Sequence, residues 1–146
     1  MASLAQSDSG TRTPASVWTG RVLTGLVALF LLADSGMKLA VPELMAANSP
    51  PNMGWPVDSG TLRMLGLLLL IPTLLYLWPR TAVLGAILIT GYLGGAIATH
   101  ARIGDPLFSH TLFGFYLALM VWGGLWLRSP ALRALLPLQA GKGLTR

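Results

Sequence analysis

Cysteine is absent from this chain of 146 residues, so the sequence excludes disulfides, thiolate nucleophiles, cysteine-ligated zinc and iron–sulfur clusters. Charged residues are scarce as well. They make up 10 % of the chain, whereas soluble domains carry about 25 % because their surfaces face water. The composition therefore argues against a water-soluble domain, and any redox role has to rely on a bound cofactor or a partner protein.

Long apolar runs make up most of the chain. Hydrophobic residues make up 53 % of the chain, and its mean hydropathy is +0.65. Each run is long enough, at about 1.5 Å rise per residue, to cross a hydrocarbon core of about 30 Å, some with help from interfacial residues. The runs are Gly20–Val41, Gly60–Trp78, Thr81–Ala101 and His110–Leu127. The fold class that they predict is all-α, an antiparallel bundle of four transmembrane helices.

The polar ends divide the chain into three parts. Residues 1–17 are expected to form a disordered cytoplasmic leader, residues 18–128 the four-helix membrane domain, and residues 129–146 a basic cytoplasmic tail. The main partner of such a protein is the lipid bilayer.

The basic residues indicate the orientation in the membrane. With an even number of crossings, seven of them share the side of the two termini, against three on the other side. The positive-inside rule therefore predicts that both termini are cytoplasmic, and we expect a multi-pass protein of a bacterial inner membrane. The net charge of +5 is spread over helix ends and forms no patch, which argues against nucleic acid as a partner.

One connection is long. The segment Pro42–Ser59 carries several prolines, which rule out a continuous helix, so we expect a loop on the outer face. Met45, Met53 and Trp55 give this loop an apolar side. It is either a connector that lies at the membrane interface or a lid over an outward-facing cavity.

Small residues predict which helices touch, because close backbone approach is a usual source of helix contacts in lipid. The stripes are Gly20, Thr24 and Ala28 on the first helix and Gly91, Gly95 and Thr99 on the third. We expect the first and third helices to be in contact. Gly123 and Gly124 on the fourth helix could equally serve a contact between copies in a homo-oligomer.

Ionisable residues near the outer helix ends are the candidates for chemistry. Asp34 and Lys38 are one turn apart on the first helix, in the favourable order for an ion pair. Each is costly inside a bilayer, at about 2.5–3.5 kcal/mol on insertion scales, so they should pair, face the bundle or reach the interface. They either neutralise one another or, with His100, form the catalytic group of a polar recess.

Further polar residues are expected to converge on the same recess. The binding candidates are Arg63, Tyr92, Arg102 and Asp105. Gly104 and Pro106 should end the third helix, so that Asp105 can pair with Arg102 or cap the next helical segment. The histidines and aspartates on this side match no metal-ligand spacing, so no metal or haem site is predicted.

Several stretches also resemble a known family. They are Gly25–Lys38, Leu75–Leu88, Thr90–His100, Gly104–Phe108 and Trp122–Arg128. Together they resemble the small four-helix DoxX-like membrane proteins, over roughly residues 17–137.

The resemblance implies a function only in outline. Some DoxX-type proteins are associated with quinone-linked thiosulfate oxidation or with membrane complexes that handle oxidative stress. The resemblance thus implies a small membrane subunit of a redox system, with a quinone as the lipophilic ligand and a redox protein as partner. A stand-alone membrane enzyme with acid–base chemistry and a non-catalytic lipid- or partner-binding protein stay open beside it.

The predicted topology can be tested directly, because the native chain carries no cysteine that would give a background signal. Single substitutions Ser9→Cys, Asn52→Cys, Ser109→Cys and Thr145→Cys supply the probes. A membrane-impermeant maleimide added outside should label positions 52 and 109 only. Labelling at position 145 would overturn the orientation.

Overall fold

The structure is a computed structural model that describes residues 15–50 and 52–135. Its long helices are α1 (Ala15–Ala40), α3 (Ser59–Leu77), α4 (Ala82–Ile103) and α5 (Phe113–Arg128). Three short helical segments join or extend them: α2 (Pro42–Ala47), η1 (Leu107–Thr111) and α6 (Pro130–Leu135). The described residues contain no strand. The predicted all-α fold class is confirmed.

The two predicted terminal segments fall largely outside this part of the chain. Residues 1–14 of the expected leader and residues 136–146 of the expected tail are not among the described residues. The remaining residues of the two segments contribute to α1 and α6.

Four helical stretches are long and apolar enough to cross a membrane. They are Ala15–Ala40, Ser59–Leu77, Ala82–Ile103 and Leu107–Arg128, the last of which combines η1 and α5. All lie over the predicted apolar runs. The chain is a multi-pass membrane protein.

Local capping interactions explain where α3 begins and where α4 ends. The Asp58 carboxylate accepts hydrogen bonds from the backbone nitrogens of Gly60, at 2.8 Å, and Thr61, at 3.0 Å, and so caps the start of α3. The bonds from the Thr61 backbone and hydroxyl, and that from Gly60, hold the pKa of Asp58 below its usual value. The stability that this cap contributes is therefore lost as the pH falls through the lowered pKa. Gly104, at φ +75°, ends α4 in the left-handed conformation, as predicted.

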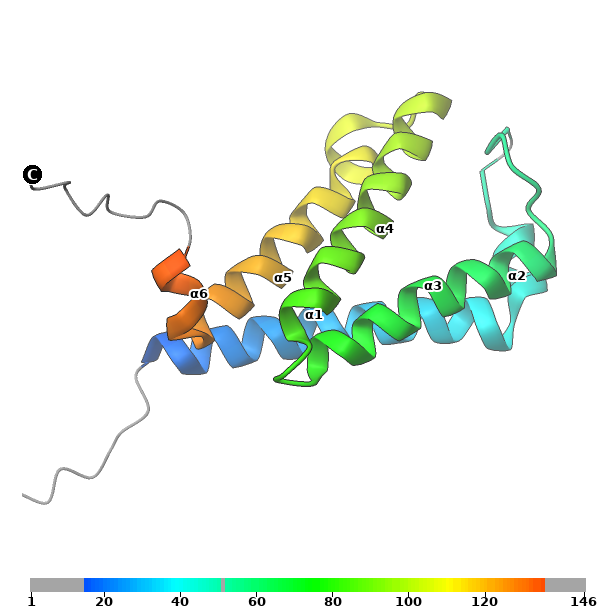
Figure 1. Ribbon diagram of the computed structural model, residues 1–146. Coiled ribbons are helices and arrows are strands. Elements are labelled where there is room, and N and C mark those ends of the chain that lie inside the picture. The colour runs from blue at the N-terminus through cyan, green and yellow to red at the C-terminus, as the bar shows by residue number, and fades with distance from the viewer. Residues whose placement is uncertain (1–14, 51, 136–146) are drawn as a thin grey trace, which may run out of the picture.

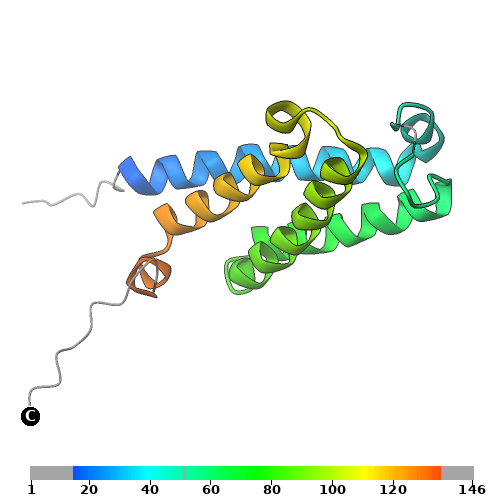
Figure 2. The ribbon, with the colours of Figure 1, turned by 90° about the horizontal axis from the view of Figure 1, so that it is seen from above.

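The helices pack in a ring in chain order. α1 contacts α3 and α5, and α4 contacts the same two helices from the other side. The views in Figures 1 and 2 show α1 and α3 lying side by side, with α4 and α5 leaning away from them. Among the described residues, the backbones of α1 and α4 do not approach one another: no Cα atom of α1 lies within 8 Å of one of α4. The predicted contact between the first and third helices is therefore wrong.

The small-residue stripe on α1 has a different partner, because it faces α5. A methyl group built on Gly124 would lie 2.8 Å from the Thr24 hydroxyl and 3.1 Å from the Gly20 carbonyl oxygen. Only glycine fits such an approach. A methyl group on Gly91 or Gly95, by contrast, would meet nothing within 4 Å among the described residues. Gly124 therefore serves a contact inside the chain, and the α4 stripe does not.

Tyr76 joins all four helices near the end of α3. Its hydroxyl donates to the Val121 carbonyl oxygen of α5 at 2.9 Å and is 3.2 Å from the Thr24 hydroxyl of α1. Its backbone packs against Gly85 of α4 with no room for a side chain there. The Tyr76 side chain is completely buried.

The two ends of the bundle differ. We call the end with the start of α1, the turn between α3 and α4 and the end of α5 the terminal end, and the opposite end the loop end. From their tight turn α3 and α4 diverge toward the loop end (Figure 1). The loop end carries α2, which begins on Pro42 and was not expected, and the loop proper, residues 48–50 and 52–58. The space between the diverging helices is where the polar side chains gather.

The packing predicts unequal effects of two glycine substitutions. Gly124→Leu should lower the Tm in detergent by about 5 °C, because overpacking a tight contact costs about 1–3 kcal/mol. Gly91→Leu is the matched control and should leave the Tm unchanged, since its side chain would enter open space. Differential scanning fluorimetry of both variants measures this. An equal loss in Gly91→Leu would show that another chain covers α4.

Candidate functional site

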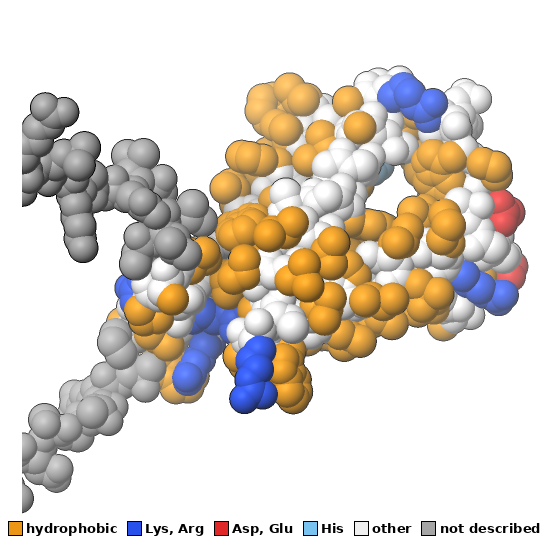
Figure 3. Space-filling view, in the orientation of Figure 1, with side chains coloured by type: hydrophobic (Ala, Val, Ile, Leu, Met, Phe, Trp, Pro, Cys, Tyr) orange, Lys and Arg blue, Asp and Glu red, His pale blue; other side chains and the backbone are white. Residues whose placement is uncertain are grey.

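A recess of about 500 Å³ lies between the diverging parts of α3 and α4, under the loop. Its walls are mostly apolar, with Leu62 and Leu65 from α3, Ala96 from α4 and Trp55 from the loop. Figure 3 shows the opening that it makes in the surface between the loop and α4. Apolar walls with a few polar groups are typical of small-molecule sites.

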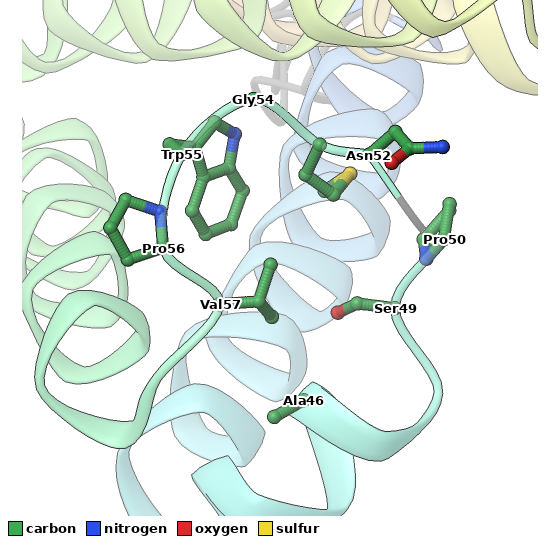
Figure 4. A pocket seen from close by; sticks show the side chains of 9 residues that line it. Ala46, Ser49, Pro50, Asn52, Gly54, Trp55, Pro56 and Val57 are labelled. Atoms are coloured by element: carbon green, nitrogen blue, oxygen red, sulfur yellow. The ribbon is translucent and has the colours of Figure 1, made fainter.

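The loop forms the roof of this recess. Figure 4 shows Trp55 turned into the hollow that the loop encloses. That hollow has about 570 Å³ and shares Ser49, Met53 and Trp55 with the recess below it. Of the two interpretations of this segment, the lid over a cavity matches its position.

Arg102 attaches the roof to α4. Its guanidinium donates a hydrogen bond to the Met53 carbonyl oxygen of the loop. The neighbouring turn includes Asn52 at φ +64° and Gly54 at φ +73°, and no side chain would fit at Gly54 against the guanidinium. One of the two alternatives for Asp105 was a pair with Arg102, the other a cap on the next helical segment. Arg102 holds the loop instead.

A smaller side chamber of about 170 Å³ adjoins the recess between α1, α4 and α5. Lys38, Tyr92, Ala96 and His100 line both spaces. Three polar side chains from two helices thus stand at the boundary between an apolar recess and a smaller chamber.

Asp34 and Lys38 form the expected ion pair on α1. The Lys38 ammonium donates to the Asp34 carboxylate. The Lys38 side chain is 13 % exposed and the Asp34 side chain 27 % exposed, so the pair faces the bundle and not the lipid. An ammonium carries three donors, and the bond to Asp34 uses one. Lys38 can therefore neutralise Asp34 and still offer hydrogen bonds to a ligand in the recess.

His100 and Asp105 form a second pair across the end of α4. The Nδ1 atom of His100 lies 2.5 Å from the Asp105 carboxylate. The other ring nitrogen, Nε2, remains free for the recess. His110 of η1 was not among the predicted site residues, but its ring lies 6.3 Å from that of His100, and it lines the side chamber. Its position ten residues after His100, across the turn that Gly104 makes, was the available signal.

Tyr92 lies deeper on α4 and lines both spaces, as expected. Its hydroxyl makes no hydrogen bond to another described residue. The hydroxyl of Thr90, two residues earlier on α4, accepts a bond of 2.9 Å from the Trp122 indole of α5 and so lies on another face.

Arg63 lies apart from the other candidates. It is exposed on α3 and lines neither the recess nor the side chamber. Its charge acts instead on Glu43 of α2, whose pKa is lowered mainly by a backbone hydrogen bond and by the Ser59 hydroxyl, and further by Arg63. Arg63 is therefore not part of the site.

The arrangement is suited to binding and proton exchange. Within the described ranges, no three histidine, aspartate or glutamate side chains are placed to hold a metal ion. What converges is a cation, an imidazole with a carboxylate partner and a phenol. All can donate hydrogen bonds to an oxygen of a bound molecule, and the imidazole can also hold or release a proton.

Comparison with known proteins supports the sequence resemblance. Residues 22–124 match the DoxX-like family. No curated protein and no solved structure matches the chain.

The ion pair on α1 predicts coupled stability effects. Asp34→Asn or Lys38→Met alone should each lower the Tm by about 5 °C, because either change leaves a largely buried charge without its partner. The double variant should recover much of the loss. Thermal unfolding of the wild type, the two single variants and the double variant completes this double-mutant cycle. Additive losses in the double variant would show that the two charges act independently.

Proposed function

The chain belongs to the DoxX-like family, and we propose that it is a small membrane subunit of a redox system that binds a quinone in the recess between α3 and α4. The observation that carries the proposal is the recess itself. It has about 500 Å³, within the usual range for small-molecule sites, and it combines apolar walls with Lys38, Tyr92 and His100 at one edge.

The residues fit such a ligand. A quinone has an apolar ring and tail and two carbonyl oxygens that accept hydrogen bonds, and the recess offers leucine and tryptophan walls beside donors from α1 and α4. When bound, a quinone supplies reversible two-electron, two-proton chemistry. In this proposal the electrons come from a partner protein, because the chain contains no cysteine that could carry thiol redox chemistry.

Lys38 and Tyr92 orient the ligand in this proposal. The Lys38 ammonium is held in place by Asp34 and directs its remaining donors toward a carbonyl oxygen. The Tyr92 hydroxyl, with no hydrogen bond to another described residue, donates to the same end of the molecule. Trp55 and Met53 cover the recess on the loop side and shield these bonds from water there, which strengthens them.

His100 holds and moves the proton. With Asp105 ionised, the Nδ1 atom carries a hydrogen that it donates to the carboxylate, so Nε2 can donate only when the ring is protonated. The protonated ring therefore both donates a bond to a carbonyl oxygen and can transfer that proton. Asp105 stabilises the charge of the ring and fixes its orientation.

The proposal places the loop end at the outer face of a bacterial inner membrane and both termini in the cytoplasm. The basic residues of the terminal end support that orientation. The redox partner then reaches the bound ligand from the loop side, where Arg102 holds the roof.

Binding can be followed through Trp55. Replacing Trp18, Trp78, Trp122 and Trp126 by phenylalanine leaves Trp55 as the one fluorophore of its kind, and a short-chain ubiquinone should quench it in a saturable manner. Lys38→Gln should weaken binding at least about tenfold, because a charge-assisted hydrogen bond contributes about 1.5–3 kcal/mol. Tyr92→Phe should weaken it about fivefold while keeping the ring.

Arg63→Gln is the matched control, since it removes a positive charge at the same end of the molecule but outside the recess. It should leave binding unchanged. Absence of saturable quenching, or equal losses for Lys38→Gln and Arg63→Gln, would contradict a quinone site in the recess.

A further inference from the structure

The terminal end carries a basic surface that the recess does not explain. Arginines 21, 80, 128 and 133 lie there, at the start of α1, in the turn after α3, and in α5 and α6. The described acidic residues, Asp34, Glu43, Asp58 and Asp105, all lie toward the loop end. Figure 3 shows red side chains at the loop end alone on this face, and blue ones at both ends.

The arginines of the terminal end lack the carboxylate partners that Lys38 and His100 have at the loop end. Both ion pairs of the described residues, Lys38 with Asp34 and His100 with Asp105, lie toward the loop end. Arg102 is bound to the loop carbonyl. At the terminal end, Arg21 lies over the Trp18 ring at 5.5 Å, and no described carboxylate pairs with it.

Arg128 has a buried donor that lacks a hydrogen-bond partner among the described residues. Its guanidinium lies 5.4 Å from the centre of the buried Tyr76 ring and donates one long bond, of 3.4 Å, to the Tyr76 carbonyl oxygen. Its Nε atom is buried without a hydrogen-bond partner among the described residues. A guanidinium has five donors. One buried donor of a half-buried cation is therefore unpaired, which is costly unless an acceptor reaches it, and an anion supplies such an acceptor.

Arg21 and Arg128 are at the same level of the bundle. A methyl group built on Gly20 would lie 3.0 Å from the Arg128 backbone nitrogen, so the start of α1 and the end of α5 are in direct contact there. Trp18 and Trp78 are 58 % and 61 % exposed at the same end. Exposed tryptophans mark the depth of lipid headgroups.

We propose that Arg21 and Arg128 bind the phosphate of an anionic phospholipid at the terminal end. Two oxygens of a phosphate can accept two parallel hydrogen bonds from the planar guanidinium of an arginine. The acyl chains of the lipid then lie against the exposed apolar surface of α1 and α5, in line with the bilayer. The source of the phosphate is a lipid and not a soluble anion, because the arginines stand at the ends of membrane spans.

Binding is measured by fluorescence anisotropy of acyl-labelled dioleoyl phosphatidylglycerol added to the full-length protein in detergent. The wild type should bind this lipid at least about tenfold more tightly than acyl-labelled dioleoyl phosphatidylcholine. Arg128→Gln and Arg21→Gln should each weaken phosphatidylglycerol binding about fivefold, as expected for one arginine near an anionic headgroup. Arg21→Gln leaves the Tyr76 contact intact, so it tests the site even if Arg128→Gln fails to fold.

Two controls separate the alternatives. Arg63→Gln removes a charge from the loop end and should not change lipid binding. Sodium phosphate should displace the lipid no better than sodium chloride of the same ionic strength. Equal binding of the two lipids, an equal loss in Arg63→Gln, or specific displacement by inorganic phosphate would overturn the proposed lipid site.

Discussion

The buried hydroxyl of Tyr76 joins three of the membrane-spanning helices. It donates to the Val121 carbonyl oxygen of α5 and lies within hydrogen-bond distance of the Thr24 hydroxyl of α1. In lipid, the hydrophobic effect does not favour a contact between two helices over a contact of each helix with lipid. Hydrogen bonds and close backbone approach therefore decide which helices pack together. The tight contact of Gly20 and Gly124 lies beside this centre, and Gly85 brings α4 against the same tyrosine. The terminal end is therefore closely packed.

The consequence appears at the loop end. Because the contacts that hold α3 and α4 together are concentrated near their turn, the helices diverge away from it and leave the recess between them. The loop covers this space through Trp55 and through the bond from Arg102 to Met53. Charged residues can lie there because each finds a partner, Lys38 in Asp34 and His100 in Asp105, so none is buried alone.

The two ends thus have opposite electrostatic designs. At the loop end, Lys38 and His100 are paired with carboxylates of the chain and line a space suited to a ligand. Arginines of the terminal end are left without carboxylate partners among the described residues and stand where lipid headgroups lie. If both proposals hold, a protein of this size combines an internal binding site with a lipid contact at its surface.

The sequence by itself determined the four spans and the fold class, because backbone groups in lipid must bond within their own helix and an apolar run of sufficient length has no other stable form. It also indicated that Asp34 and Lys38 pair, since residues four apart on a helix are neighbours in any packing. Only the tertiary structure decided which helices touch. Small-residue stripes occur on α1 and α4 alike, and the choice of α5 as the partner of α1 depends on the fit of Gly124 against Thr24, which no single stripe encodes. The partner of Asp105 and the attachment of Arg102 to the loop were decided in the same way, because both depend on where a turn places a side chain relative to segments distant in the chain.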